Sequence, residues 1–159
     1  MKRTELKRLV HAHDSVWTKW WPALIDLPKA DARRVVGGSH GSVMATTVHM
    51  VSTEIYWQHR LERVAAPRGP TRLRGLTPLH AEWEALQARR RRWLRDADAD
   101  RRVTFLADSG ARVSVAAWEC LVHVVSHAHF QRGQLVSQFR ALGIVPPSRH
   151  LIGPFFSEF

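Results

Sequence analysis

Four long stretches of this sequence carry apolar residues at intervals of three and four, and this spacing constrains the fold more than any other feature. Residues at those intervals lie on one face of an α-helix, so each stretch has an apolar face to bury. No strands alternate clearly with these stretches. The spacing therefore predicts an all-α protein, a four-helix bundle that forms a single domain over residues 1–159. The predicted helices cover about residues 3–27, 42–64, 77–95 and 114–143. The second of them is predicted to bury Met44, Val48, Val51 and Ile55.

The ends of these helices are marked by residues that favour helix termini. Ser42 follows a glycine-rich loop and is predicted to be the N-cap of the second helix, and Thr77, which precedes a proline, is predicted to cap the third. Ser114 is predicted to cap the fourth helix and Gly143 to end it. Pro22 is expected to kink the first helix or to restart it.

Three segments between and after the helices carry turn-forming residues. The segment from Ala65 to Leu76, rich in proline and glycine, is predicted to be a long crossover connection. Two short extended pieces around Asp108-Ser109-Gly110 predict a small hairpin before the last helix. The tail from Ile144 to Phe159 is expected to pack across the bundle as an extended segment.

The charge and the cysteine content limit the classes of function. The formal net charge is +10, and arginine supplies 20 of the 24 basic residues, but these are scattered and no nucleic-acid-binding motif accompanies them. A nucleic-acid partner is therefore the less favoured interpretation. The single cysteine, Cys120, excludes an internal disulfide, and no apolar run suits a signal peptide or a membrane span. We expect a cytoplasmic protein.

A column of polar side chains interrupts the last helix. His123, His127 and Gln131 are four residues apart and therefore lie one above another on the helix surface. Either they bind a ligand, or buried hydrogen bonds satisfy them. Two histidines four apart suit adjacent positions around a metal ion, and His49 in the second helix is the candidate third ligand. A divalent ion held in this way would acidify a bound water or thiol.

The remaining histidines do not show the spacing of metal ligands. His13 lies on the apolar stripe of the first helix, where it lines the same cavity or fills core space, and we favour core space. His40 and most of the others are expected at the surface or in loops. Cys120 lies too far along the helix from His127 to be a co-ligand and is predicted to be a small core residue.

Two segments resemble the DinB-like superfamily of bacterial four-helix-bundle metalloproteins, which includes the YfiT-type proteins. The stretch Val48-His49-Met50 with Glu54-Ile-Tyr-Trp57 is similar to the family's second helix. The stretch His123-Val-Val-Ser-His127, followed by Arg132-Gly133-Gln134, is similar to its signature helix. The resemblance extends over nearly the whole chain.

The resemblance implies a divalent metal, nickel or zinc, held by one histidine of the second helix and two histidines four apart on the last. By position these are His49, His127 and residue 131, and here residue 131 is Gln. A neutral amide oxygen is a poorer ligand for these ions than imidazole, so the metal site is weakened or lost. His123 is a substitute one turn from His127, which would move the ion by about 6 Å along the helix.

The resemblance also implies a class of reaction. Characterised relatives include S-transferases that use low-molecular-weight thiols, so the chain is expected to be a metal-dependent enzyme that activates a thiol for a small-molecule substrate. Arg132 or Arg60 is the candidate for holding acidic groups of that thiol. Homodimers are usual in the family, and a homodimer is the expected assembly.

Two further hypotheses stand beside this one. The chain is alternatively a metal-free, non-catalytic bundle that binds a small organic ligand or a stress-related partner, and Gln131 favours that alternative. The least favoured hypothesis is a basic nucleic-acid-binding protein.

Overall fold

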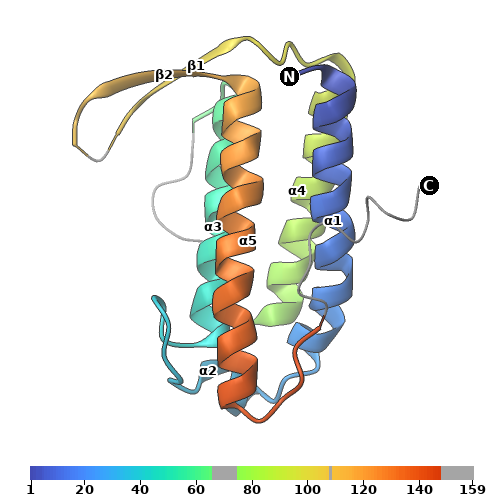
Figure 1. Cartoon of the computed structure of the whole chain (residues 1–159), viewed down its shortest axis with the longest axis vertical. Coiled ribbons are helices and arrows are strands. Elements are labelled where there is room, and N and C mark those ends of the chain that lie inside the picture. Colours follow the sequence, from blue (N-terminus) through green and yellow to red (C-terminus); the bar gives the residue numbers. More distant parts are fainter. Residues whose placement is uncertain (66–74, 108, 148–159) are drawn as a thin grey trace.

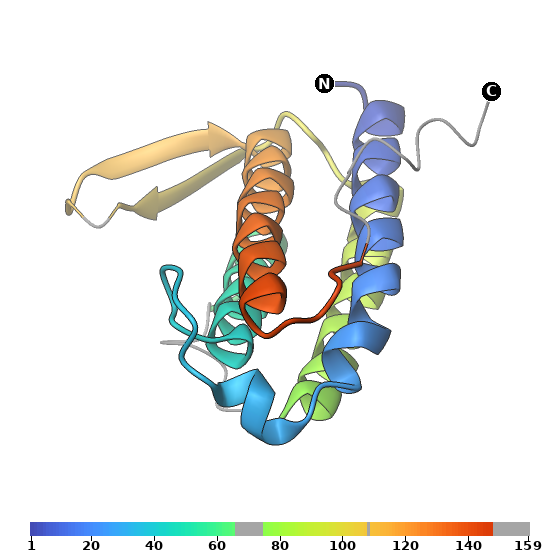
Figure 2. The same ribbon diagram turned by 60° about the horizontal axis from the view of Figure 1, so that its bottom comes forward.

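The protein consists of four long helices that lie side by side, with a short helix at one end and a hairpin at the other (Figures 1 and 2). The computed structural model describes residues 1–65, 75–107 and 109–147. The predicted all-α architecture is confirmed. In chain order the elements are α1 (Arg3–Ile25), α2 (Lys29–Arg33), α3 (Val43–Glu62), α4 (Leu76–Asp96), β1 (Arg102–Leu106), β2 (Arg112–Ala116) and α5 (Ala117–Ala141).

The directions of the helices explain the predicted crossover. Helix α1 packs against α4 and α5, and α3 packs against α5 and α4. Helices α3 and α4 run in the same direction, whereas α5 runs opposite to α3 (Figure 1). Two parallel helices that follow each other in the chain need a long return connection. The described residues do not include most of the predicted connection (residues 66–74). They also do not include residues 148–159 of the predicted tail.

The core is apolar along the whole bundle. The larger cluster joins side chains from α1, α3, α4 and α5 around Trp17, Trp20 and Trp21, each at most 1% exposed. A second cluster lies nearer the hairpin and includes Leu61, Leu121 and the free Cys120. Cys120 is thus a core residue, as predicted, and burial raises the pKa of its thiol to about 11. None of the helices in the described ranges combines the length and apolar character that a membrane-spanning helix needs.

Two of the predicted helix ends are confirmed. The Ser42 hydroxyl accepts a hydrogen bond from the backbone N–H of Ala45 at 3.2 Å, as an N-cap side chain does. At the end of α5, Gly143 has φ +75° and the N–H of Ile144 donates to the carbonyl of Phe139 at 2.9 Å. This is the Schellman arrangement, in which a residue in the left-handed region ends the helix.

Two predictions about helix ends are wrong. Gly75, not Thr77, is the N-cap of α4, and the helix starts earlier because the proline after Thr77 lies in the first turn, where its missing N–H costs nothing. Ser114 pairs with Thr104 inside β2, and α5 begins only after Ala116 because the strand runs directly into the helix. Of the two effects expected of Pro22, the restart is not seen, because α1 continues through this residue to Ile25.

The buried face of α3 also differs from the predicted stripe. Val51 and Ile55 are buried as predicted, but Met44 and Val48 are only half-buried. The face toward the core is rotated, because α3 contacts α4 as well as α5 and buries polar residues between them. Its buried residues are Val43, Thr46, Thr47, Met50, Val51, Glu54, Ile55, Gln58 and Leu61.

The hairpin and one short helix complete the fold. Strands β1 and β2 are antiparallel, with Phe105 paired to Val113, which confirms the predicted hairpin. Gly110, with φ +80°, forms part of its turn. Helix α2 was not predicted, because five residues between Pro28 and Arg34 are too few to show a periodic pattern.

Candidate functional site

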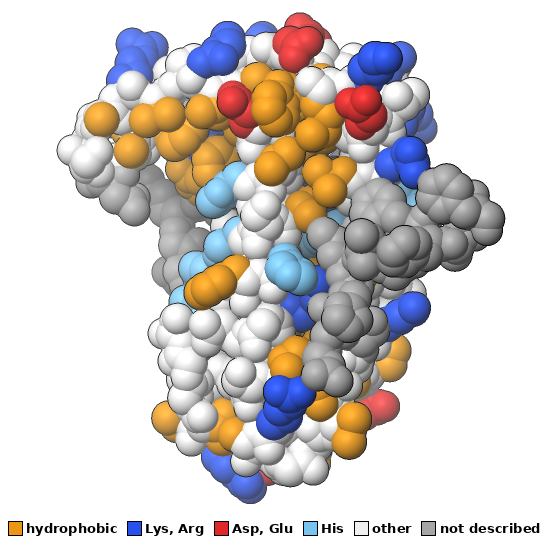
Figure 3. All heavy atoms as spheres, viewed as in Figure 1, with side chains coloured by type: hydrophobic (Ala, Val, Ile, Leu, Met, Phe, Trp, Pro, Cys, Tyr) orange, Lys and Arg blue, Asp and Glu red, His pale blue; other side chains and the backbone are white. Residues whose placement is uncertain are grey.

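The antiparallel helices α3 and α5 bring His49 and His127 together. The two side chains meet across the helix interface, with their Nε2 atoms 3.1 Å apart and their rings inclined by 60°. Both residues are half-buried. Figure 3 shows histidine side chains gathered on this face of the molecule, below the hairpin. Two imidazole nitrogens therefore converge on one point at the edge of the bundle core.

Gln131 lies beside this pair, one turn after His127 on α5. Its Nε2 is 3.3 Å from His127 Nε2, while its Oε1 is buried without a hydrogen-bond partner in the described part of the chain. His127 Nε2 thus accepts from the Gln131 amide and from His49, which places the proton of His127 on Nδ1. Nδ1 is itself buried without a partner among the described residues. This tautomer keeps the lone pair of Nε2 on the side where the three side chains meet.

The spacing of these atoms fits ligands that share an ion. An ion about 2.1 Å from each of two nitrogens separates them by about 3.0 Å at a right angle and about 3.4 Å at the tetrahedral angle. The Nε2 atoms of His49 and His127, 3.1 Å apart, lie in that range. The Gln131 atom 3.3 Å from His127 Nε2 is the amide nitrogen, a donor, so the amide oxygen takes its place as a ligand only after a half-turn of the amide group. Across the described residues, no three side chains of His, Cys, Asp or Glu are grouped closely enough to hold an ion. The candidate donor set is therefore two imidazoles and one amide.

The two histidines are held neutral by their surroundings. Burial, together with the smaller effects of the neighbouring His49 and His123, lowers the pKa of His127 to about 4. Burial also lowers the pKa of His49, and His40 adds to that effect. Neutral imidazole is the form that binds a metal ion. At neutral pH, protons therefore compete little for these two nitrogens.

His40 is a site residue that the sequence analysis missed. It was expected at the surface or in a loop, and it does lie in the loop before α3, but its ring stacks on that of His49 with centroids 4.1 Å apart. The loop turns at Gly37, Gly38 and Gly41, which all have positive φ. No local pattern could have placed His40 here, because the loop path sets its position.

His123, the proposed substitute ligand, belongs to a different set of contacts. Its ring stacks on that of His127 with centroids 6.0 Å apart, and it packs on Trp57 at 5.1 Å. Trp57 in turn contacts Phe105 of β1, and the guanidinium of Arg60 lies over the Phe105 ring. These rings form a continuous aromatic face, defined here as His123, Trp57 and Phe105, that leads from the histidine pair to Arg60.

The two arginines expected to hold acidic groups lie in different places. Arg60 follows His49 by eleven residues, which puts it on the same face of α3 about 16 Å further along. Arg132 follows His127 by five residues, about 140° around α5, and its Nη2 contacts Nδ1 of His129. Arg132 is only 1% exposed, and burial lowers its pKa to about 10. The structure therefore places Arg60, and not Arg132, on the histidine face.

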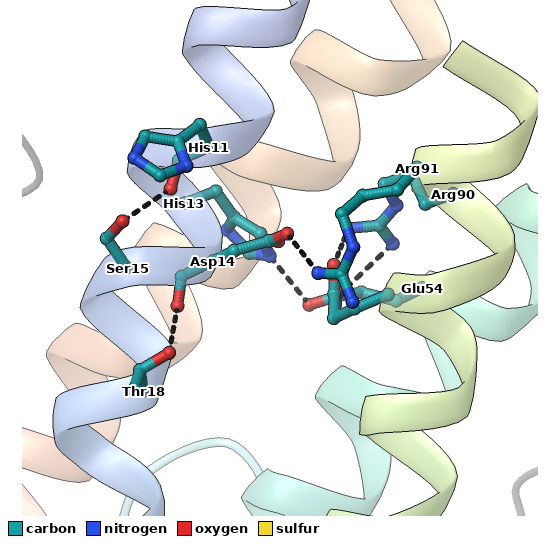
Figure 4. A network of polar contacts seen from close by, with 9 residues as sticks. His11, His13, Asp14, Ser15, Thr18, Glu54, Arg90 and Arg91 are labelled. Atoms are coloured by element: carbon teal, nitrogen blue, oxygen red, sulfur yellow. Dashed lines mark hydrogen bonds and ion pairs between the residues drawn. The ribbon is translucent and has the colours of Figure 1, made fainter. Parts of the chain in front are cut away.

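A buried charged network lies in the core behind the pair. His13 from α1, Glu54 from α3 and Arg90 from α4 point toward one another (Figure 4). Glu54 Oε1 is 3.2 Å from His13 Nε2, and Oε2 accepts from Arg90 Nη2 at 2.8 Å. All three are at most 1% exposed. His13 and Arg90 hold the pKa of Glu54 at about 2 against the opposing effect of burial, which is the largest single influence.

Asp14 and Gln87 extend this network toward the surface. In the orientation in which the Gln87 amide nitrogen donates to Asp14 Oδ1 at 2.5 Å, its oxygen accepts from Trp83 Nε1 at 2.9 Å. Burial raises the pKa of Asp14, although Arg90 and His13 act against it. His13 was expected to fill core space rather than to line the cavity, and its complete burial confirms this. Glu54 was not predicted as a core residue, although Met50, Glu54, Gln58 and Leu61 form a column at helical spacing.

Comparison with known proteins agrees with this architecture. A model of the DinB family matches residues 1–153 of the chain. Among curated proteins, none matches.

Proposed function

As the chain belongs to the DinB family, we propose that it is a divalent-metal-dependent protein that binds a low-molecular-weight thiol and activates it for transfer to a small molecule. The single observation that carries the proposal is the convergence of His49 and His127, whose Nε2 atoms are 3.1 Å apart between two helices. Their lowered pKa values keep both imidazoles neutral at pH 7, which is the form that binds a metal ion.

Each residue has a defined part in this proposal. His49 and His127 supply the two strong ligands, and Gln131 supplies its amide oxygen after a half-turn of the amide group. Nickel or zinc, when bound, lowers the pKa of a coordinated thiol or water. Arg60 holds an acidic group of an extended thiol that lies along the aromatic face. An amide in place of a third imidazole makes this a weak site, so we expect partial occupancy in purified protein.

The orientation of Gln131 does not argue against an ion. Without an ion, its oxygen would meet only the lone pair of His127 Nε2, so the amide nitrogen must face the imidazole. With an ion between them the preference reverses, because the oxygen is then the ligand. The observed contact at 3.3 Å is the one expected of an ion-free chain under either function.

A second function is favoured by the same contact. The Gln131 amide and His49 together satisfy His127 Nε2 without any ion, which suits a metal-free bundle that binds a small organic ligand. Metal-ligating histidines usually donate their other ring N–H to an oxygen, and His127 Nδ1 has no such partner in the part of the chain described. Titration with metal ions separates the metal-dependent function from the metal-free one.

The direct test is calorimetric titration of Ni²⁺ and Zn²⁺ into protein purified without a nickel resin and stripped with chelator. We expect one ion per chain, loss of binding in His49→Ala and His127→Ala, and unchanged binding in His11→Ala, an exposed histidine on α1. Gln131→His restores a third imidazole and is expected to tighten binding at least tenfold. Absence of metal binding in both the wild type and Gln131→His would refute the metal function.

Thiol activation needs a second measurement on the metal-loaded protein. Addition of glutathione or a similar thiol to the Ni²⁺ form is expected to produce a thiolate-to-metal charge-transfer absorption band, which a non-coordinating alcohol of the same size does not produce. Metal binding without that band would leave a metalloprotein and exclude activation of the thiol on the ion.

A further inference from the structure

A cavity of about 350 Å³ lies where the end of α3 meets the start of β1. Four of the seven residues that line it are arginines. The lining residues are Arg60, Arg63, Val64, Arg101, Arg102, Val103 and Thr104. We call this cavity the arginine pocket. It lies about 16 Å along α3 from His49, beyond the aromatic face.

The positive charge of the arginine pocket is not balanced by nearby carboxylates. In the described ranges, no ion pair within 4.0 Å joins any of the four guanidinium groups to an acidic side chain. The ion pairs found there are those of other residues. Burial, and after it the charge of Arg63, lowers the pKa of Arg101, whereas Asp98 and Cys120 act to raise it. Like charges held together in this way favour an anion between them.

The guanidinium groups are positioned by contacts that leave donors unused. Arg60 Nη2 donates to the Tyr56 hydroxyl, the group lies over the Tyr56 ring at 4.5 Å, and its buried Nε has no hydrogen-bond partner in the described part of the chain. Arg102 Nε donates to Ser114 Oγ at 3.2 Å, and its Nη2 donates to the Ser114 carbonyl. Arg63 is exposed. A buried donor without a partner is costly, and an oxyanion in the pocket would satisfy it.

A structural role accounts for two of these arginines. Arg101 Nη2 donates to the carbonyl of Leu61, so it caps the C-terminal end of α3 and covers a carbonyl that would repel an anion. Arg102 joins β1 to β2 through its two bonds to Ser114. These bonds do not explain why Arg60 and Arg63 line the same cavity.

We propose that the arginine pocket binds a phosphate group. A phosphate monoester carries nearly two negative charges and three acceptor oxygens, whereas a carboxylate carries one charge and two oxygens. Several planar guanidinium groups around one cavity match the former, because each can donate two parallel N–H bonds to phosphate oxygens. The group is carried by a small molecule or by a nucleic-acid backbone. The proposal goes beyond the metal function, since it holds whether or not the histidine pair binds an ion.

Arg63→Gly is the informative variant. Arg63 has φ +60°, a left-handed conformation that glycine adopts without strain, so the substitution removes a guanidinium and relieves the backbone at the same time. We expect an unchanged or higher melting temperature together with a loss of phosphate affinity of about tenfold, as for one charge-assisted hydrogen bond. Arg140→Ala is the charge-matched control, because Arg140 lies at the far end of α5.

The experiment titrates inorganic phosphate, pyrophosphate and succinate into the full chain and follows binding by calorimetry. We expect saturable binding of the two phosphates, weaker in Arg63→Gly, unchanged in Arg140→Ala and retained in His49→Ala. The last result separates this site from the metal site. Equal affinity for succinate, equal affinity in Arg63→Gly and Arg140→Ala, or no saturation by either phosphate would overturn the proposal.

Titration of random duplex DNA at about 50 mM salt assigns the source of the phosphate. Duplex binding that weakens in Arg63→Gly more than in Arg140→Ala would support the pocket as a contact for a nucleic-acid backbone. Duplex binding that weakens equally in both variants, with pyrophosphate binding still dependent on Arg63, would support a small-molecule phosphate.

Discussion

Glu54→Gln tests the buried charged network that links α1, α3 and α4. The substitution keeps the size of the side chain but removes the charge that faces His13 and Arg90, which lie 3.2 and 2.8 Å from its oxygens. Arg90 is 1% exposed, so it keeps a buried positive charge with a weakened partner. Removal of one partner from such a pair costs about 3–5 kcal/mol of unfolding free energy.

The pKa of Glu54 leads to a similar magnitude. It falls from 4.5 to about 2 in the folded chain, and at about 1.4 kcal/mol per unit the ionised form contributes about 3 kcal/mol. Asp14 offsets part of the loss, because the charge of Glu54 raises the pKa of Asp14 and its removal favours the Asp14 carboxylate. We therefore expect a cost near 3 kcal/mol, a large fraction of the roughly 5–15 kcal/mol typical of a folded domain.

The assay is urea denaturation of the wild type and the variant between pH 7 and pH 2. Because the folded pKa of Glu54 is lowered, its contribution is complete above about pH 4.5 and is lost as the pH falls toward 2. The stability difference between the two proteins should shrink over that interval. Glu84→Gln, at an exposed residue of α4, is the control and should cost less than about 0.5 kcal/mol. A cost below about 1 kcal/mol at pH 7, or a difference that does not change with pH, would refute the reasoning.

Three further outcomes follow from the described geometry. Because the pKa of His127 is lowered to about 4 and that of His49 lies below its usual value, metal affinity should decline at lower pH than for two ordinary imidazoles, and a loss of about tenfold or more between pH 8 and pH 6 in calorimetry would contradict this. Gly143→Ala should cost about 1 kcal/mol in urea denaturation because Gly143 has φ +75°, whereas Gly133→Ala, in α5 with open space around it, should be neutral or stabilising. Ser42→Ala should cost about 1 kcal/mol through the lost hydrogen bond to the N–H of Ala45, and an unchanged denaturation midpoint would show that the cap is not needed.

The sequence predicted the parts of this molecule that depend on helical periodicity. The four long helices follow from apolar residues three and four apart, and the column from His123 to Gln131 follows from the same spacing. The structure adds that this column runs from an exposed residue, His123, to a buried one, Gln131. Periodicity describes each helix alone, so it could not show which residue of α3 faces His127. His49 was the candidate because it lies in the middle of the second helix beside the apolar stripe, and the resemblance to a family indicated the same residue.

The features that were missed depend on tertiary packing. His40 reaches His49 only through the path of a glycine-containing loop, and Glu54 is buried because α1 and α4 supply His13 and Arg90 as partners. An acidic residue beside an apolar stripe is usually solvent-exposed, and only its partners on other helices reverse that expectation. Ser114 was assigned as a cap because a strand that runs directly into a helix leaves no loop to mark the boundary.

The contact between His49 and His127 is sensitive to how the antiparallel helices α3 and α5 are aligned along their axes. His49 and His127 are 78 residues apart in the chain, and their contact depends on how far one helix is shifted along the other. A slip by one residue moves a side chain by about 1.5 Å and turns it by about 100°, enough to separate the two rings. If the proposed ion binds at this pair, its uptake would report correct docking of the two helices, and a misfolded chain with full helical content would fail to retain it.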